Sequence, residues 1–278
     1  YRKPSAHKKR LTKAKFIWKV WSHSNSCAMH CPMLNFLDYP TKASSPLPPL
    51  LIVHGLYGSA RNWGVVSKRL ASDRRVIAVD LRNHGDSPWF DSHSYFDMAQ
   101  DLAEVITHFD QPMAVIGHSM GGKAAMILAL ERPELVDRLC VADIAPVGYS
   151  HDQSQYISAM RSVDLAKIEK RSEAISALAD EIEDPALHSF FTQSLDLKNR
   201  RWKLNLDVLE QEMPKIIGFP KIDKQFEIPT LFLSGADSTY VTPEMRPQIK
   251  ALFPTARFAK IPNAGHWLHA EQPRVFET

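Results

Sequence analysis

The sequence predicts an α/β fold: a mostly parallel central sheet with helices on both faces and a helical cap inserted between two late strands. Short apolar, often β-branched runs alternate with segments of helical periodicity, as expected for strands joined by crossover helices. The 278 residues, 44% of them hydrophobic, can bury the core of one large domain or of one domain with an insertion. Between Pro146 and about Glu227 the strand pattern disappears and helical periodicity replaces it.

The first half of the chain supplies most of the predicted sheet. Residues 33–37 are predicted as an edge strand, and a proline-rich connection over 45–49 leads to a buried strand over 50–53. Helical spacing over 62–70 precedes a β-branched strand over 75–79, and apolar positions from 98 to 109 form one helix face. A strand over 113–116 precedes a helix that includes 124–128 and stops before Pro133. Another strand is predicted over 138–142.

The second half contains the insertion and the end of the sheet. Helices are predicted over 157–160, 165–178, 185–195 and 204–213, and strands over 229–234 and 256–261, with a terminal helix starting at Pro273. Helices inserted above the carboxyl edge of the sheet would restrict access to a site there. We therefore expect a core made of residues 33–146 and 228–278, with a helical cap over 147–227.

Residues 1–32 form a basic leader with eight lysines and arginines and no acidic residue, although the whole chain has a net charge of only +3. We expect a disordered or non-native extension ahead of a natural start near Met33, with organelle targeting as the alternative. Potential metal ligands in this leader complete no site of known spacing, so no metal is expected. They are His23, Cys27, His30 and Cys31.

Composition also limits the compartment and the partners. The three cysteines, which include Cys140, cannot build a disulfide framework, and this favours a reducing, cytoplasmic location. No apolar run approaches the roughly 18 residues that span a bilayer. We expect neither a nucleic-acid partner nor stable membrane insertion, and the oligomeric state cannot be read from the sequence.

The segment around Ser119 carries the strongest chemical signal. An apolar run ends in Gly117-His118-Ser119-Met120-Gly121, and a helical pattern follows. Small residues two positions either side of a serine allow a sharp strand-to-helix turn that exposes its hydroxyl at a helix N-terminus. Ser119 is therefore the predicted nucleophile.

A serine hydroxyl needs a base to remove its proton, and the base needs an acid to orient it. The expected chain order on this kind of elbow fold is serine, acid and histidine. His266 follows the last predicted strand and lies behind Gly265, so it is the predicted base. We expect the nearby His269 to pack or hydrogen-bond within the loop instead.

Four segments together resemble the α/β-hydrolase superfamily. They are the serine elbow with Gly122-Lys123, the pair His54-Gly55, the loop from Asp80 to Ser87 and the triplet Gly265-His266-Trp267. With Asp143-Ile144-Ala145-Pro146, the pattern is similar to small bacterial carboxylesterases related to mitochondrial α/β-hydrolase-domain esterases. The resemblance covers the chain from about Met33 and implies the α/β-hydrolase fold. It also implies a serine hydrolase of esters or thioesters that needs no metal or organic cofactor.

The same resemblance implies an oxyanion hole built from backbone N–H groups. One donor would be Met120, the residue after the nucleophile, and the other Leu56, behind His54-Gly55. Tyr57 and His118 are candidate substrate-binding residues. In the Asp80 to Ser87 loop, we expect Arg82 and His84 to brace the loops rather than to react.

The acid has more than one candidate. In many members of the superfamily it lies three residues beyond a glycine after the strand that follows the cap, but that position here is Ser238, with Asp237 one residue earlier. The similar esterases usually have asparagine at the Asp237 position and take the acid from the end of the preceding strand, where this chain has Asp143. We favour Asp143 over Asp237, and Asp207 in the cap is the third candidate.

These residues predict a serine carboxylesterase that acts through an acyl-enzyme on a small-molecule ester, with short to medium acyl chains preferred. Thioester hydrolysis, C–C bond hydrolysis and perhydrolysis are alternatives on the same triad. A slow-turnover receptor for a small ligand, or an inactive scaffold, is the alternative outside enzymes.

Overall fold

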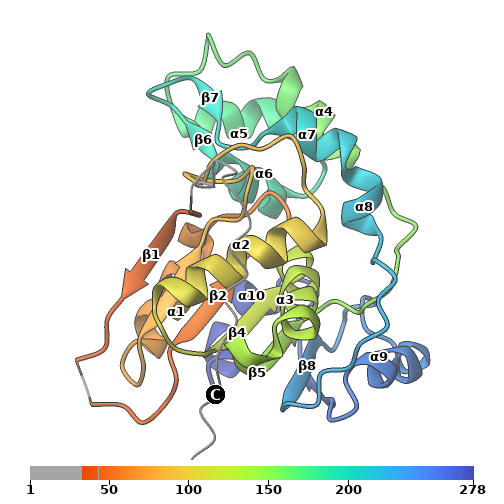
Figure 1. Ribbon diagram of the computed structural model, residues 1–278. Helices are drawn as coiled ribbons and strands as arrows, with labels where there is room; N and C mark the ends of the chain where they lie inside the picture. Colours follow the sequence, from red (N-terminus) through yellow and green to blue (C-terminus); the bar gives the residue numbers. More distant parts are fainter. Residues whose placement is uncertain (1–32, 43) are drawn as a thin grey trace, which may run out of the picture. The chain divides into compact units, whose positions relative to one another are not determined.

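The computed structural model describes residues 33–42 and 44–278. Its main sheet contains seven strands in the order β1-β3-β2-β4-β5-β8-β9, in which β1 alone runs antiparallel to its neighbour (Figure 1). These strands are β1 (Phe36–Tyr39), β2 (Leu50–Val53), β3 (Val76–Val79), β4 (Met113–His118), β5 (Val136–Ala142), β8 (Thr230–Gly235) and β9 (Arg257–Ile261). The predicted α/β class with a mostly parallel central sheet is therefore confirmed.

Helices cover both faces of this sheet because the buried strands are apolar on both sides. In β2, Leu51 and Val53 pack with α2 (Tyr95–His108) and α3 (Met120–Glu131), which lie together in front of the sheet in Figure 1. The alternate residues, Leu50 and Ile52, pack with α1 (Gly64–Leu70), α10 (Leu268–Glu271) and α11 (Pro273–Phe276). Successive side chains of a strand point to opposite faces, so these four residues serve two hydrophobic cores.

The edge strand lies further along the chain than predicted. Strand β1 begins at Phe36 and pairs with β3 from Phe36 opposite Val79 to Tyr39 opposite Val76. The preceding residues bind the loop after β3 instead, since Asn35 receives the backbone N–H of Asp80 and donates its own to Ser87. The strand predicted over 33–37 therefore starts too early, because its first residues pair with a loop and the strand itself begins at Phe36.

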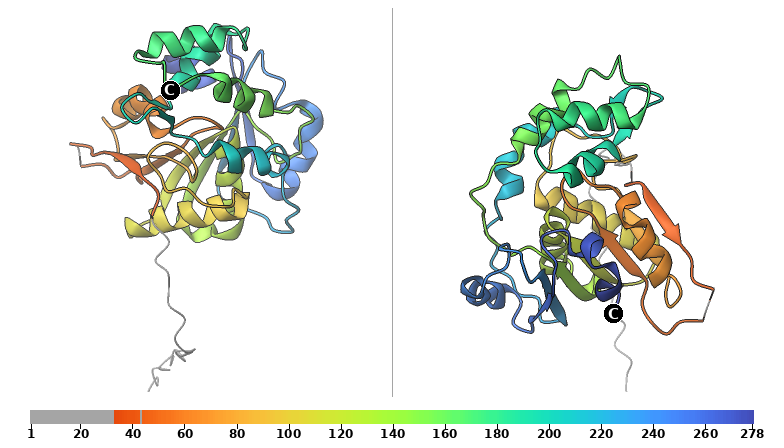
Figure 2. Two further views of the ribbon diagram at one scale, coloured as in Figure 1. Left: turned by 90° about the horizontal axis from the view of Figure 1, so that it is seen from above. Right: turned by 180° about the vertical axis from the view of Figure 1, so that it is seen from behind.

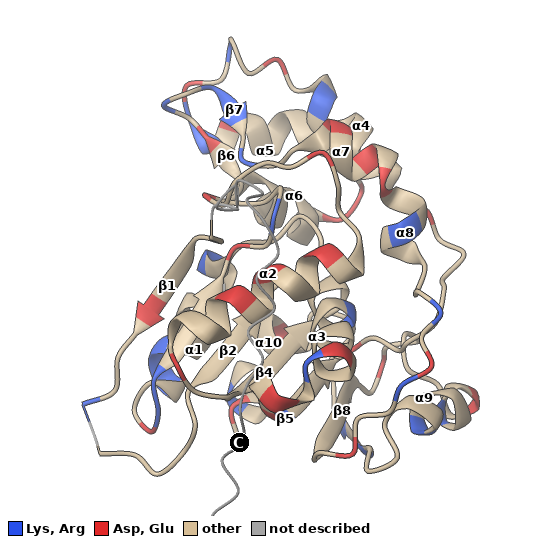
Figure 3. Ribbon diagram, in the orientation of Figure 1, with Lys and Arg blue, Asp and Glu red and all other residues tan. Residues whose placement is uncertain are grey.

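The segment between β5 and β8 contains most of the remaining elements. They are α4 (Ser154–Ser162), α5 (Arg171–Ala179), α6 (Pro185–Thr192), β6 (Leu195–Asp196), β7 (Arg201–Trp202), α7 (Leu206–Gln211) and α8 (Met213–Ile217), while α9 (Arg246–Leu252) follows β8. This inserted segment gathers at one end of the sheet, at the top of Figure 1 and again in the right view of Figure 2. Its basic and acidic residues are interspersed (Figure 3).

Three predictions within the inserted segment were wrong in detail. The segment contains a two-stranded antiparallel pair, β6 and β7, where only helices were expected. The helix predicted from 165 begins at Arg171, because the Glu173 carboxylate receives the backbone N–H groups of Glu169 and Lys170 at its start. The last predicted helix is divided into α7 and α8 at Glu212, and Pro214 lies in the first turn of α8.

The basic leader and its potential metal ligands lie outside the described residues. Within the described ranges, no helix has the length and apolar content that crossing a bilayer requires. The cytoplasmic location rests on cysteine usage and stays a prediction.

Candidate active site

The elbow at Ser119 joins β4 directly to α3. Ser119 has φ 53° and ψ −121°, a conformation that costs an L-residue energy and is over-represented at functional sites. The turn requires its glycines for close approach: a Cβ on Gly117 would lie 2.4 Å from the carbonyl oxygen of Gly121, and one on Gly121 would lie 2.3 Å from that of His54. Local packing thus holds the serine hydroxyl at the carboxyl end of the central strand.

A continuous hydrogen-bonded chain runs from Ser119 through His266 to Asp143. Nε2 of His266 lies 3.1 Å from Oγ of Ser119, and Nδ1 lies 2.8 Å from Oδ2 of Asp143. Asp143 is fully buried, whereas the His266 side chain is one-fifth exposed. Three segments supply these groups: the ends of β4 and β5 and the loop after β9. The arrangement suits proton transfer from a hydroxyl to an imidazole whose other nitrogen is held by a carboxylate.

Asp143 receives two further hydrogen bonds, one from the last residue of β8 and one from the loop that follows. The Ser238 hydroxyl donates to Oδ2 at 2.5 Å, and the Gly235 backbone N–H donates to Oδ1 at 3.2 Å. The sequence alone assigned no role to Ser238, although this residue stands three positions after Gly235, where many members of the superfamily have the acid. These donors satisfy a carboxylate that would otherwise be buried with a single partner.

The other two candidate acids lie elsewhere. Asp237 is exposed, and its backbone N–H is bonded to the carbonyl of Ala264. Asp207 lies on α7, where its largely exposed carboxylate pairs with Arg161 at 2.6 Å. Among the described residues, Asp143 pairs with His266 and neither of these two carboxylates does, so Asp143 is the candidate acid that the geometry brings to the predicted base.

Two aromatic side chains fix the orientation of His266. The ring of Tyr240 stacks on it with centroids 4.0 Å apart and an angle of 21° between planes. Nε2 of His118 donates to the backbone carbonyl of His266 at 2.8 Å. Burial, together with the neighbouring His269 and His266, holds the pKa of His118 well below its usual range, so His118 is neutral at physiological pH.

The two predicted oxyanion donors flank the elbow. Met120 is the first residue of α3, where a backbone N–H has no acceptor within its own helix. The backbone N–H of Leu56 has no partner among the described residues. The loop that carries Leu56 lies against the elbow, because a Cβ on Gly55 would come within 3.2 Å of the Cβ of Ser119. The next N–H, that of Tyr57, is already used by Nε2 of His84 at 3.2 Å.

A cavity of about 280 Å³ opens at Ser119. Its wall includes the predicted substrate-binding residues, Tyr57 and His118, although Tyr57 directs its hydroxyl to the carbonyl of Gln153 and both side chains are almost completely buried. Their contact with substrate stays a prediction. Core and inserted segment both contribute apolar and aromatic lining, including Ile144, Tyr156, Leu187, Phe190, Phe191, Ile216, Ile217 and Trp267.

Three polar residues near the site brace the structure, as the sequence led us to expect. Arg82 binds Asp101 through two buried hydrogen bonds of 2.6 and 2.8 Å. His84 supports the loop after β2 through the backbone of Tyr57. His269 stacks on Trp63 with ring centroids 4.0 Å apart, and burial lowers its pKa to about 3. The described part of the chain contains no cluster of three or more potential metal ligands.

Comparison with known proteins agrees with the fold. A family model described as the alpha/beta hydrolase fold matches residues 48–273. The chain is 40% identical over 254 residues to the protein named sn-1-specific diacylglycerol lipase ABHD11 from Mus musculus, across 87% of this chain and 81% of the relative. It is 38% identical to the protein named Esterase YbfF from Escherichia coli, across 81% of this chain and 88% of the relative.

A solved structure agrees as well. The structure titled Marine microorganism esterase superposes with a TM-score of 0.82 at 38% identity, covering 88% of this chain and 97% of its own. The family resemblance predicted from the motifs is confirmed.

Proposed function

This chain belongs to the α/β-hydrolase family, and we propose that it is a serine carboxylesterase in which Ser119, His266 and Asp143 are nucleophile, base and acid. The observation that carries the proposal is the hydrogen-bonded chain of these three side chains at the cavity. The names of the relatives, which include an esterase and a lipase, support ester hydrolysis as the reaction class.

In the first half of the reaction, the oxygen of Ser119 attacks the ester carbonyl carbon while Nε2 of His266 takes the hydroxyl proton. The carbonyl oxygen becomes an oxyanion, which the N–H groups of Leu56 and Met120 stabilise. Each such donor is worth about 3 to 4 kcal/mol of transition-state stabilisation. The tetrahedral intermediate collapses, the C–O bond to the alcohol breaks, and His266 returns its proton to the leaving oxygen.

In the second half, water replaces the alcohol. His266 removes a proton from the water as its oxygen attacks the acyl carbon, and the bond from that carbon to Ser119 then breaks. The same proton passes from His266 to the Ser119 oxygen, so the enzyme is regenerated. Throughout, Asp143 holds the Nδ1–H tautomer and stabilises the positive imidazolium, and Ser238 holds Asp143 in place.

We propose that the inserted segment acts as a cap that selects the acyl group. Much of the apolar wall belongs to it, including Leu187, Phe190 and Phe191. A cavity of about 280 Å³ is just below the usual range for ligand sites, about 300 to 1,000 Å³, which favours short to medium acyl chains. The relative named as a diacylglycerol lipase makes a glycerolipid ester the second candidate substrate.

Two measurements test this proposal. An organophosphate is expected to label Ser119, and p-nitrophenyl esters from acetate to decanoate are expected to give a burst of p-nitrophenol and then steady turnover. A folded protein that is not labelled would overturn the proposal. Ligand-induced stabilisation without steady turnover would indicate a receptor, and turnover of diacylglycerol far above all the short esters would favour the second candidate substrate.

A further inference from the structure

Lys123 is a buried cation that the proposed mechanism does not use. It lies on α3, one helical turn after Ser119, lines the same cavity and is only 1% exposed. Its Nζ donates to the backbone carbonyls of Ile217 at 2.9 Å and Gly218 at 2.6 Å. These carbonyls belong to the end of α8, where the last carbonyl groups of a helix lack partners within the helix.

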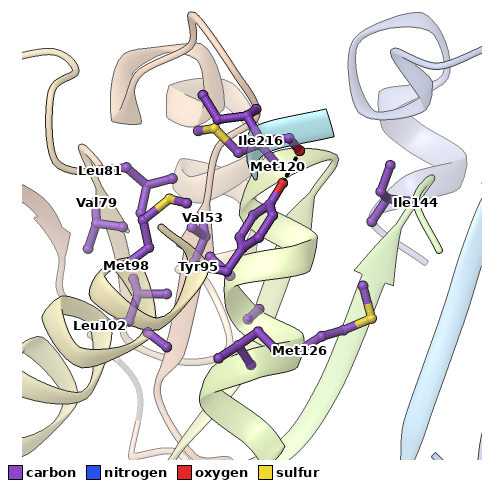
Figure 4. Close-up of a cluster of buried hydrophobic side chains, with 14 of the residues drawn as sticks. Val53, Val79, Leu81, Tyr95, Met98, Leu102, Met120, Met126, Ile144 and Ile216 are labelled. Carbon is purple, nitrogen blue, oxygen red and sulfur yellow. Dashed lines mark hydrogen bonds between the residues drawn. The ribbon is translucent and has the colours of Figure 1, made fainter. Parts of the chain in front are cut away.

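A second core side chain holds the adjacent carbonyl. The Tyr95 hydroxyl, on α2, donates to the carbonyl of Ile216 at 2.5 Å (Figure 4). The backbone N–H of Tyr149, a residue near the start of the inserted segment, also donates to the carbonyl of Ile217 at 3.0 Å. We call Tyr149 together with residues 216–218 the neck, because the chain enters and leaves the inserted segment there. Lys123 and Tyr95 therefore tether the neck to the core.

Within the part of the chain that the structure describes, no carboxylate is a hydrogen-bond partner of Lys123. Its Nζ lies 4.8 Å from the ring centroid of Tyr149 and 5.7 Å from that of Tyr95, so aromatic faces and carbonyl dipoles surround the charge. Burial lowers the pKa of Lys123 to about 7. An apolar side chain of similar size would avoid the desolvation cost, but it would leave the carbonyls of Ile217 and Gly218 without this donor.

The neck also forms part of the cavity wall. Ile216 and Ile217 both line the cavity that contains Ser119, and Lys123 binds the carbonyl of Ile217 itself and that of the next residue. A shift of the neck would move this wall relative to the nucleophile. It would not move the contact between Ser119 and His266, because β4 and the loop after β9 hold these two residues.

We propose that Lys123 is a specificity-determining residue whose ammonium group fixes the neck, and thereby the Ile216 and Ile217 wall that limits the length of the acyl chain. The proposal rests on the proposed esterase function. The neutral amine still has N–H donors, but its hydrogen bonds to the carbonyls lose their charge-assisted strength, so loss of the proton loosens the neck. Discrimination against long acyl chains is therefore expected to weaken as pH rises through the titration of Lys123.

Other groups near Lys123 do not replace it in this role. Tyr95 and Tyr149 have pKa values raised by burial, so both stay neutral where Lys123 titrates. The pKa of His151 is lowered by burial, by His266 and by Lys123 itself, so this imidazole loses its charge at a lower pH. On α8, Glu212 and Lys215 pair with each other at 2.6 Å.

The test compares kcat/KM for p-nitrophenyl octanoate with that for p-nitrophenyl acetate at about pH 6 and about pH 8.5, through the titration of Lys123. The ratio removes the pH dependence of the triad, which both esters share. We expect the wild-type ratio to rise with pH, and Lys123→Met to have a high, pH-independent ratio. The expected rise is about tenfold and lies mainly in KM, comparable with the discrimination of one methylene group in an apolar pocket.

Two further variants control the experiment. Lys250→Met, at an exposed position on α9, is expected to behave as the wild type. Tyr95→Phe removes the other tether without changing a charge, so it is expected to raise the octanoate-to-acetate ratio of kcat/KM and to keep the pH dependence of that ratio. If Lys123→Met does not fold, Tyr95→Phe still tests the role of the neck. At about pH 6, octanoate-to-acetate ratios of folded Lys123→Met and Tyr95→Phe within twofold of the wild-type ratio would overturn the proposal. Organophosphate labelling, measured in parallel, separates this result from failure of the esterase function.

Discussion

Replacement of Asp143 by asparagine tests which carboxylate serves the proposed triad. Asp143 receives hydrogen bonds from His266, Ser238 and Gly235, and it is fully buried. An asparagine of the same shape keeps the packing but presents an NH₂ group as well as an oxygen. If the NH₂ group faces Nδ1, His266 must take the tautomer that carries its proton on Nε2, which cannot accept the proton of Ser119.

The size of the effect follows from this change of tautomer. An equivalent Asp-to-Asn change in a serine protease triad lowers kcat by about 10⁴-fold. At about 1.4 kcal/mol per factor of ten, the Asp143→Asn transition state would lose about 5 kcal/mol of stabilisation. KM is expected to change little, because a carboxylate behind the imidazole does not contact the ester. Ser238→Ala removes one charge-assisted hydrogen bond, worth about 1.5 to 3 kcal/mol, and is expected to lower kcat by about 10- to 100-fold.

The assay is steady-state release of p-nitrophenol from p-nitrophenyl butyrate, with thermal unfolding measured on each variant. Asp237→Asn is the matched control, because Asp237 is exposed and its substitution is expected to leave kcat within about twofold, as for most exposed positions. Near-normal turnover of Asp143→Asn together with a loss of several orders of magnitude in Asp237→Asn would reverse the assignment. If both variants kept full activity, the triad itself would be refuted.

Three other predictions concern the nucleophile, the elbow and the buried lysine. Ser119→Ala is expected to abolish organophosphate labelling and to reduce ester turnover by about 10⁴-fold or more, as measured by mass spectrometry and steady-state kinetics. Gly121→Ala would place a Cβ 2.3 Å from a backbone oxygen and is expected to destabilise the protein by at least about 3 kcal/mol in urea unfolding, whereas Gly148→Ala, with its nearest atom at 3.9 Å, is expected to be close to neutral. Because the pKa of Lys123 in the folded protein is lowered to about 7, the unfolded chain binds one more proton than the folded protein above that pH. The free energy of unfolding should therefore rise by about 1.4 kcal/mol per pH unit between about pH 7.5 and 8.5. Lys123→Met should remove this slope.

Much of the fold could be predicted because its signals are local. Strands β2 and β3 are continuous apolar runs, and each is buried along its whole length. The short pair β6 and β7 could not be predicted, because two-residue strands have no detectable periodicity and their pairing depends on the turn between them. The break between α7 and α8 could not be predicted either, because apolar residues continue on both sides of Glu212.

The same contrast between local signals and long-range contacts applies to the candidate site. Ser119 and His266 belong to local motifs, whereas the choice between Asp143 and Asp237 depends on how the ends of β5 and β8 lie relative to the loop after β9. Lys123 was visible in the elbow motif but had no assignable role. Its partners are 94 and 95 residues further along the chain, and no local pattern reports such a contact.

The proposed nucleophile and the proposed acid are held in the same way, by the ends of neighbouring parallel strands. Ser119 and Asp143 each follow a strand, with φ of 53° and 52°. Each also extends the ladder by one bond, Ser119 to the carbonyl of Ala142 at 3.0 Å and Asp143 to that of Leu233 at 2.8 Å. The register of three adjacent parallel strands, β4, β5 and β8, therefore sets the distance between the two functional ends. Strain at either residue is opposed by strand pairing and not by the loops alone, so the triad is expected to remain assembled when the inserted segment moves.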